Sequence, residues 1–211
     1  MNVAIVKYNA GNIYSVVNAL KRLGVDPLLT DSPELLASAD RVLFPGQGEA
    51  RQAMTYLREH GLDRVIRDLR QPVLGICIGQ QLLCRHSEEG DTDCLGIFPV
   101  DVLRFQPQRH EDKVPHMGWN SIEVRGKMWD GRCGMEDGRC EKLLDGLGDN
   151  PYVYFVHSYY VPVCEFTSAI CDYIVPFSAA LHRDNFHATQ FHPEKSGSIG
   201  ERILKQFLDN S

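Results

Sequence analysis

The sequence predicts an α/β fold of three layers, in which a mostly parallel central sheet lies between helices. Short apolar runs alternate with segments of helical periodicity through the first ninety residues or so. Strands that alternate with crossover helices form parallel sheets covered on both faces. The second half is an additional strand-rich region. No linker or low-complexity tract divides the 211 residues, so we expect one domain over 1–211.

In the first half, each predicted element follows from a local pattern. Short apolar runs predict strands at 2–8, 25–30, 41–46 and 73–79. Helices are predicted between and after them, at 12–24, 33–39, 49–70 and 80–90. The helix at 12–24 is typical, because its apolar side chains recur at helical spacing and Gly24 supplies a stop.

The second half predicts strands at 96–105, 114–124, 151–163, 169–175, 179–183 and 187–191. A closing helix is expected at 198–210, where Ile199, Ile203 and Phe207 share one face. An apolar face of this kind indicates docking on the core. The segment 126–150 is rich in Gly and Asp and predicts an exposed loop.

Composition excludes several classes of function. The chain has 28 acidic against 22 basic side chains and a net charge of −6, which argues against nonspecific nucleic-acid binding. No stretch approaches the roughly 20 apolar residues that span a bilayer, so no membrane association is expected. The first residues lack the pattern of a signal peptide, which indicates a cytoplasmic location.

The seven cysteines indicate reduced thiols, because the count is odd and no C-x-x-C pair occurs. They are Cys77, Cys84, Cys94, Cys133, Cys140, Cys164 and Cys171. Spacings of six intervening residues in Cys133/Cys140 and Cys164/Cys171 are too loose for a common zinc site. We therefore expect neither a metal nor a cofactor, and most of these thiols are expected to be buried hydrophobes or surface groups.

The motif G-I-C-I-G at 75–79 predicts a nucleophile elbow with cysteine in place of serine. A sharp strand-to-helix turn strains the nucleophile, and Gly75 and Gly79 remove side chains that would collide with it. The turn places Cys77 at a helix N-terminus, where the N–H of Ile78 can face a developing oxyanion. The alternative is a buried structural cysteine on a strand.

The motif H-P-E at 192–194 predicts a base and its orienting carboxylate. If the backbone is extended, His192 and Glu194 lie on one side of it. Glu194 could then hold the imidazole while its other nitrogen faces Cys77. An ordinary surface turn is the alternative, and the upstream elbow decides against it.

The motif P-G-Q-G at 45–48 ends a predicted strand. Glycines on both sides of Gln47 allow the backbone to turn its N–H groups inward, which predicts a second wall of an oxyanion hole from Gly46, Gln47 and Gly48. A plain strand-to-helix turn explains the motif equally well.

Together these motifs resemble the class I glutamine amidotransferases, the triad type, in their order and spacing. The pattern of that family is an oxyanion loop with P-G, then G-x-C-x-G-x-Q, then a C-terminal H-P-E. Segments at 8–24, 45–50, 115–120 and 154–160 resemble, within this class, the HisH-type glutaminase subunits of imidazole glycerol phosphate synthase. The resemblance covers essentially the whole chain.

The resemblance implies a catalytic triad of Cys77, His192 and Glu194 that hydrolyses L-glutamine through a γ-glutamyl thioester. It implies that Gln81 and Glu89 hold the amino-acid end of the substrate, with Glu89 on the ammonium. The backbone at His157, Ser158 and Tyr159 would hold the carboxylate. For Glu89 the alternative is a solvated helix end, and for residues 157–159 a buried strand end.

The resemblance also implies a partner. A HisF-type cyclase barrel would form a heterodimer with this chain and receive the ammonia through an internal tunnel, for use in histidine biosynthesis. Residues expected at that interface are Asn12, Trp119, Asn120 and Lys195, for which surface scatter is the alternative.

The chain departs from the family pattern at three places. In the family a glycine usually follows the tyrosine that corresponds to Tyr8, whereas here Asn9 and Ala10 intervene. Gln47 replaces a small branched apolar residue, and the segment 126–146 is longer than typical. The change at Gln47 puts the behaviour of the oxyanion loop in doubt, and none of the three touches the triad.

Other functions stay open. Glutaminases of the same class that serve pyridoxal phosphate or anthranilate synthesis are disfavoured by 115–120 and 154–160. A cysteine peptidase or γ-glutamyl hydrolase is disfavoured by Gln81 and Glu89. The intact Cys–His–Glu set argues against a silent binding module.

Overall fold

The computed structural model describes residues 1–9, 13–125 and 143–209. Its central feature is an eight-stranded sheet in the order β2-β1-β3-β4-β14-β13-β12-β9. The five strands from β2 to β14 are mutually parallel, and β13, β12 and β9 continue the sheet in antiparallel fashion. The predicted mostly parallel sheet is confirmed.

The elements of the first half follow the predicted alternation. Their bounds are β1 Val3–Val6, α1 Ile13–Arg22, β2 Leu28–Thr30, α2 Pro33–Ala37, β3 Arg41–Gly46, α3 Ala50–Glu59, α4 Leu62–Asp68, β4 Val73–Cys77 and α5 Ile78–Leu83. The residues expected to be helical at 49–70 are helical, but as two helices, because Gly61, with φ +68°, separates α3 from α4.

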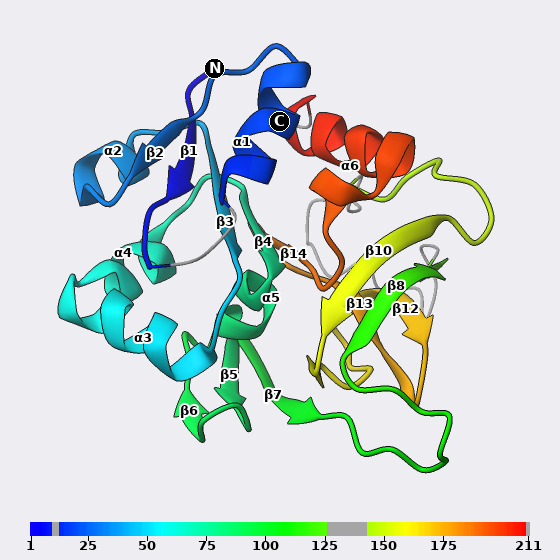
Figure 1. The fold of residues 1–211 in the computed structure, drawn as a ribbon. Coiled ribbons are helices and arrows are strands. Elements are labelled where there is room, and N and C mark those ends of the chain that lie inside the picture. Colours follow the sequence, from blue (N-terminus) through cyan, green and yellow to red (C-terminus); the bar gives the residue numbers. More distant parts are fainter. Residues whose placement is uncertain (10–12, 126–142, 210–211) are drawn as a thin grey trace.

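The helix expected at 80–90 is wrong after Leu83, because α5 ends there and the chain continues as β5, Cys84–Ser87. Cys84 and Ser87 are buried, and β5 pairs with β7, Phe98–Arg104, on one side and with β6, Thr92–Asp93, on the other. Together with β11, Tyr159–Tyr160, these strands form a four-stranded sheet below α5 (Figure 1).

The remaining elements confirm a strand-rich second half. They are β8 His116–Ser121, β9 Glu123–Val124, β10 Tyr152–His157, β12 Thr167–Asp172, β13 Pro176–Arg183, β14 Phe186–Thr189, a 3-10 helix η1 at Pro193–Lys195, and α6 Gly197–Asp209. Strands β8 and β10 form a separate antiparallel ribbon. Most of the expected loop at 126–150 lies outside the described residues.

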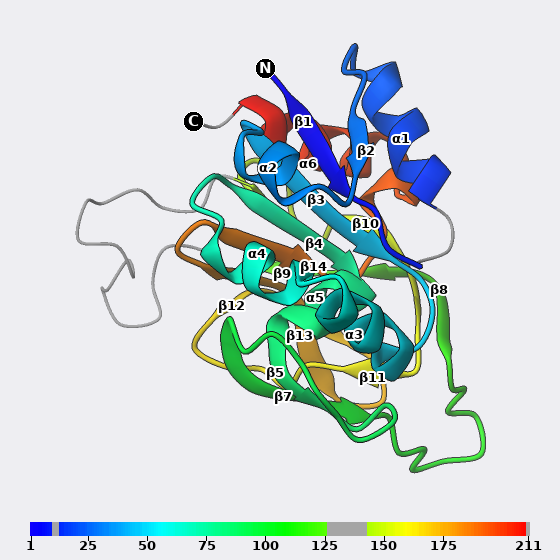
Figure 2. The ribbon, with the colours of Figure 1, turned by 90° about the vertical axis from the view of Figure 1, so that its left-hand side faces the viewer.

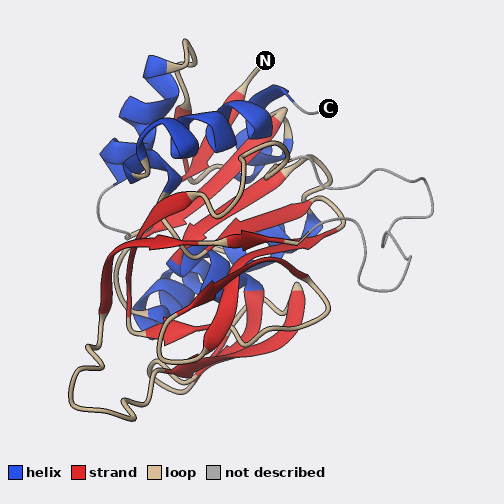
Figure 3. Ribbon diagram, turned by 90° about the vertical axis from the view of Figure 1, so that its right-hand side faces the viewer, coloured by secondary structure: helices blue, strands red, loops and turns tan. Residues whose placement is uncertain are grey.

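Side-chain alternation along the strands fills two cores, one on each face of the sheet. On one face Val3 and Ile5 of β1 pack with α1 and α6. On the other face Ala4 and Val6 pack with α2, α3, α4 and α5. Figure 2 looks onto the face that α2, α3 and α4 cover, and Figure 3 shows α1 and α6 from the opposite side. These are the three predicted layers.

Candidate active site

Cys77 occupies a strained turn between β4 and α5. It is the last residue of β4, α5 begins at Ile78, and its backbone has φ +56° and ψ −110°. A positive φ at a non-glycine residue is uncommon and gathers at functional sites. A Cβ on Gly79 would collide with the carbonyl oxygen of Phe44, and one on Gly75 would lie 2.8 Å from Leu83. Both positions therefore require glycine, but the clashes that glycine avoids are with Phe44 and Leu83, and not with the nucleophile as the motif predicted.

His192 and Glu194 form a buried pair. Nδ1 of His192 donates to Oε1 of Glu194 at 2.8 Å, and the two side chains are 3% and 2% exposed. The reason differs from the one expected, because the segment is not extended: Glu194 lies within η1, and the N–H of Lys195 donates to the carbonyl of His192. The tight turn brings the carboxylate back to the ring.

Electrostatics favour a charged imidazole at this position. Burial lowers the pKa of His192, but the nearby Cys77, followed by Glu194, raises the pKa to about 10. Among the described residues no atom makes a hydrogen bond that meets normal geometry with Nε2 of His192. That nitrogen is therefore free to take the proton of Cys77, and an imidazolium is stabilised once it does.

A cavity of about 290 Å³ opens in front of the sulfur. Its lining residues are Gln47, Gly48, Cys77, Ile78, Gln81, Glu89, Val156, His157, Ser158 and Tyr159. Most of the predicted oxyanion and substrate residues thus meet in one place. Gly46 does not line the cavity: it pairs with Cys77 across β3 and β4 and lies against the Tyr8 hydroxyl.

Gln81 and Glu89 reach this cavity from different elements. Nε2 of Gln81, on α5, donates to the carbonyl of Tyr159 at 3.0 Å. Glu89 is not at a helix end, as its alternative reading required, but follows β5, where its Oε2 accepts from the N–H of Ala50 at 2.9 Å. Burial raises the pKa of Glu89, which the bond from Ala50 opposes.

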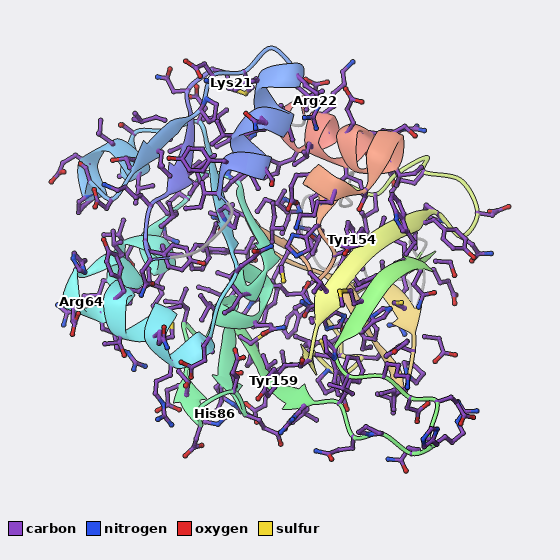
Figure 4. All side chains as sticks on the ribbon, in the orientation of Figure 1. Lys21, Arg22, Arg64, His86, Tyr154 and Tyr159 are labelled. Atoms are coloured by element: carbon purple, nitrogen blue, oxygen red, sulfur yellow. The ribbon has the colours of Figure 1, made fainter. Side chains whose placement is uncertain are left out.

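His157 lines the cavity, and its imidazole is neutral. Its Nδ1 donates to the carbonyl of Tyr159 at 2.7 Å, so its Nε2 accepts from Nδ1 of His116 at 3.1 Å. Burial lowers the pKa of His157 to about 3. Ser158 and Tyr159 follow in the lining, and Tyr159 lies beside β7, as Figure 4 shows.

The residues of this chain that were expected at the partner interface differ in their exposure and contacts. Trp119 on β8 is 54% exposed and meets Tyr154 of β10 edge to face. Asn120 is tied to the fold, because its Nδ2 donates to the carbonyl of Asp172 at 3.1 Å. Lys195 is half-buried beside a groove of about 340 Å³ between α1, η1 and α6. Asn12 lies outside the described residues.

Two residues at the sulfur were not assigned a role from the sequence. The thiol of Cys77 donates to the carbonyl of Val156, and Nε2 of Gln190 donates to the sulfur, each at 3.8 Å. Gln190 lies two residues before His192. This proximity to the H-P-E motif was the one signal in the sequence that could have identified it. Val156 lies within the segment 154–160, but no pattern in that segment distinguished this residue from its neighbours.

The described cysteines, Cys77, Cys84, Cys94, Cys164 and Cys171, are free thiols. The other two lie outside the described residues. In the described ranges, no three His, Cys, Asp or Glu side chains converge as a metal site would require. No described helix is both long enough and apolar enough to cross a membrane.

Comparison with known proteins places the chain in a family. The family model for glutamine amidotransferase class-I matches residues 4–211. A relative from Bacteroides thetaiotaomicron, "imidazole glycerol phosphate synthase subunit HisH", is 62% identical over 209 residues, which are 99% of this chain and 100% of the relative. A relative of the same description from Escherichia coli K12 is 41% identical over 210 residues, with the same coverage.

Solved structures agree at the level of the fold. A putative GMP synthase protein from Thermoplasma acidophilum aligns with a TM-score of 0.72 at 20% identity, over 99% of this chain and 92% of that one. A glutamine amidotransferase from Thermotoga maritima aligns with a TM-score of 0.61 at 16% identity, over 99% and 83%. With the family model and the closely similar relatives, the chain belongs to the class I glutamine amidotransferases and, within them, to the HisH family of imidazole glycerol phosphate synthase subunits.

Proposed function

We propose that this chain hydrolyses L-glutamine to glutamate and ammonia with Cys77, His192 and Glu194, and delivers the ammonia to a cyclase subunit. The observation that carries the proposal is the geometry of the sulfur. Cys77 stands on a positive-φ elbow at the floor of the cavity, near a histidine whose Nδ1 is 2.8 Å from a buried carboxylate.

Each triad residue has one role in the proposed reaction. The Cys77 thiol gives its proton to Nε2 of His192, and the thiolate attacks the side-chain amide carbon of glutamine. His192 returns the proton to the leaving ammonia, and a thioester remains on Cys77. Water then attacks the thioester with His192 as base, which releases glutamate. Glu194 keeps the ring oriented throughout.

The oxyanion would be stabilised by the backbone N–H of Ile78 and by the Gly46–Gly48 loop. Gly48 has φ +132°, a conformation that a side chain would strain, and the loop lines the cavity at Gln47 and Gly48. We expect a turn of one peptide in this loop to switch the activity. Gln47 extends from this loop, so its side chain would move with it.

Hydrogen-bond polarity supports the proposed substrate orientation. Both Nε2 hydrogens of Gln81 are used, one on the carbonyl of Tyr159 and one on Oε1 of Gln190. The atom of Gln81 left for the substrate is therefore an oxygen, which accepts from the α-ammonium. Glu89 adds a carboxylate to the same end, and the backbone at 157–159 receives the carboxylate.

The partner part of the proposal rests on the name of the relatives and on the surface. The relatives are described as a subunit of imidazole glycerol phosphate synthase. Met117 and Trp119 are 65% and 54% exposed and stand two residues apart on β8, so they present one apolar face. We expect this face, with Lys195, to bind a HisF-type cyclase barrel as a heterodimer that acts in the cytoplasm.

Glutamine hydrolysis by wild type and Cys77→Ala, each with and without the liganded cyclase subunit, tests the proposal. Wild type should be strongly stimulated by the partner, and Cys77→Ala should lose at least about a thousandfold in rate under every condition. Activity retained by Cys77→Ala would contradict the triad. Equal wild-type rates with and without the partner would contradict partner control.

A further inference from the structure

Gln190 is a buried amide that contacts the nucleophile and has no part in the mechanism above. It is fully buried, and its backbone N–H donates to the carbonyl of Ala179 on β13 at 2.9 Å, so the main chain is fixed. Its side chain reaches from the end of β14 to the sulfur of Cys77, where Nε2 lies 3.8 Å from Sγ. A buried polar side chain at the reacting atom calls for a chemical reason.

The orientation of this amide is set by a chain of hydrogen bonds that begins at the backbone. The carbonyl of Tyr159 can only accept, so the group of Gln81 that faces it is the amide nitrogen. The same nitrogen donates its other hydrogen to Oε1 of Gln190 at 2.9 Å. Turning Gln190 over would set two amide nitrogens against each other. Its Nε2 therefore faces the sulfur as a donor.

The sulfur needs such a donor when it is charged. In the neutral state the thiol donates to the carbonyl of Val156. After the proton moves to His192, that carbonyl oxygen faces an anion and offers it no hydrogen. Apart from His192 itself, Gln190 is the side-chain donor that the described structure sets on Sγ. Hydrogen bonds to an ionised acceptor are stronger than neutral ones.

We propose that Gln190 is a catalytic residue: its amide N–H holds the Cys77 thiolate, and the chain from Tyr159 through Gln81 keeps that donor turned toward the sulfur. The inference rests on the proposed function in taking Cys77 as the nucleophile.

Two matched substitutions test it. Gln190→Met keeps a side chain of similar volume and removes the donor. Gln80→Met makes the same change at a neighbouring, fully buried glutamine whose Nε2 donates to the carbonyl of Ser178 at 3.1 Å, away from the sulfur. Iodoacetamide alkylation of Cys77, read by mass spectrometry of its peptide without glutamine, is followed against pH.

Gln190→Met should alkylate about tenfold more slowly near neutral pH, with the acid limb of the rate profile moved up by about one pH unit. Gln80→Met should follow wild type. With glutamine and the cyclase subunit, kcat of Gln190→Met should fall about tenfold, with a smaller change in KM.

Gln190→Glu gives a second test that is isosteric. It keeps the acceptor for Gln81 and places a carboxylate oxygen on the sulfur, so the alkylation profile should move further in the same direction. A wild-type profile in either Gln190 variant, or the same shift in Gln80→Met, would overturn the inference. Absence of glutamine hydrolysis by wild type would count against the proposed function alone, because alkylation needs no turnover.

Discussion

At the scale of single residues, the site combines paired and unpaired polar groups in one buried space. Glu194 holds one nitrogen of His192, whereas the other nitrogen and Oε2 of Glu194 have no hydrogen-bond partner of normal geometry among the described residues. The hydroxyl of Tyr8, which lies against Gly46 of β3, is also buried and unpaired within that part of the chain. Such groups cost stability, and they gather where a reaction changes the charge.

Tyr8→Phe should stabilise the fold. Burial, followed by the charge of Cys77, raises the pKa of Tyr8, so the phenol is neutral. Removing a buried hydroxyl without a partner should raise the free energy of unfolding by about 1 kcal/mol, as measured by urea unfolding. A loss of stability of similar size would show that this hydroxyl has a hydrogen-bond partner in the folded protein.

The sequence was sufficient for those parts of the site whose causes are local. The elbow follows from glycines two residues on either side of Cys77, and the His192–Glu194 contact spans two residues. The contact between Gln190 and Cys77 joins positions 113 apart and exists because β14 pairs with β4. A choice of strand neighbour is a long-range outcome that no local pattern specifies.

At the scale of elements, local prediction failed where the pairing of distant strands determined the secondary structure. Residues 80–90 suit a helix locally, yet Cys84 and Ser87 bury against β7 as a strand, with Cys84 opposite Phe98 and Ser87 opposite Val102. Tertiary packing overrides modest helix propensity. The short α5 has a functional consequence, because the chain returns at once to bring Glu89 to the cavity and to the N-terminus of α3.

The packing of α6 on η1 leads to a prediction at this scale. A Cβ on Gly200 would collide with the carbonyl oxygen of Pro193 and lie 2.9 Å from Cβ of Ser196. Gly200→Ala should therefore push η1, which carries Glu194, away from its position. Displacing a catalytic group by about 1 Å can cost about a hundredfold in rate, so kcat for glutamine should fall by about that factor.

Lys205→Ala is the matched control, because Lys205 is exposed on the same helix. Its kcat should equal that of wild type, and both variants should remain folded by circular dichroism. If Gly200→Ala were folded and as active as Lys205→Ala, α6 would have no role in positioning Glu194.

At the scale of the whole molecule, the site lies where parallel strands end. Gly46 closes β3, Cys77 closes β4 opposite it, and His192 follows β14 on the other side of β4. Ligand sites in open α/β sheets lie at the carboxyl ends of the strands. Alternating strands and helices predicted this sheet and its layers, whereas its strand order depends on contacts between distant segments.

A buried histidine pair makes the whole fold sensitive to acid. His116 stacks on Tyr173 and Phe155 and donates to His157. Burial lowers the pKa of His116 from 6.5 to about 4, and that of His157 to about 3. Below pH 6.5 these histidines bind protons in the unfolded chain but not in the folded chain. Their contribution to the free energy of unfolding is therefore complete above that pH and falls toward pH 4.

His192 does not cause this loss of stability in acid. Its folded-state pKa is raised to about 10, so its contribution is complete below 6.5 and is lost as the pH rises from 6.5 through about 10, which opposes the effect of the pair by less than about 1 kcal/mol between about pH 5 and about pH 7. Between about pH 7 and about pH 5, each histidine of the pair should therefore remove about 2 kcal/mol from the free energy of unfolding.

Urea unfolding of wild type and His116→Phe at these two pH values measures the effect. The phenyl ring keeps the stacking with Tyr173 and Phe155, and it removes one of the two titrating groups. The variant should therefore lose about half as much stability as wild type over this interval. If the two proteins lost the same amount, the acid sensitivity would arise outside the pair, from carboxylates or from other histidines of the fold.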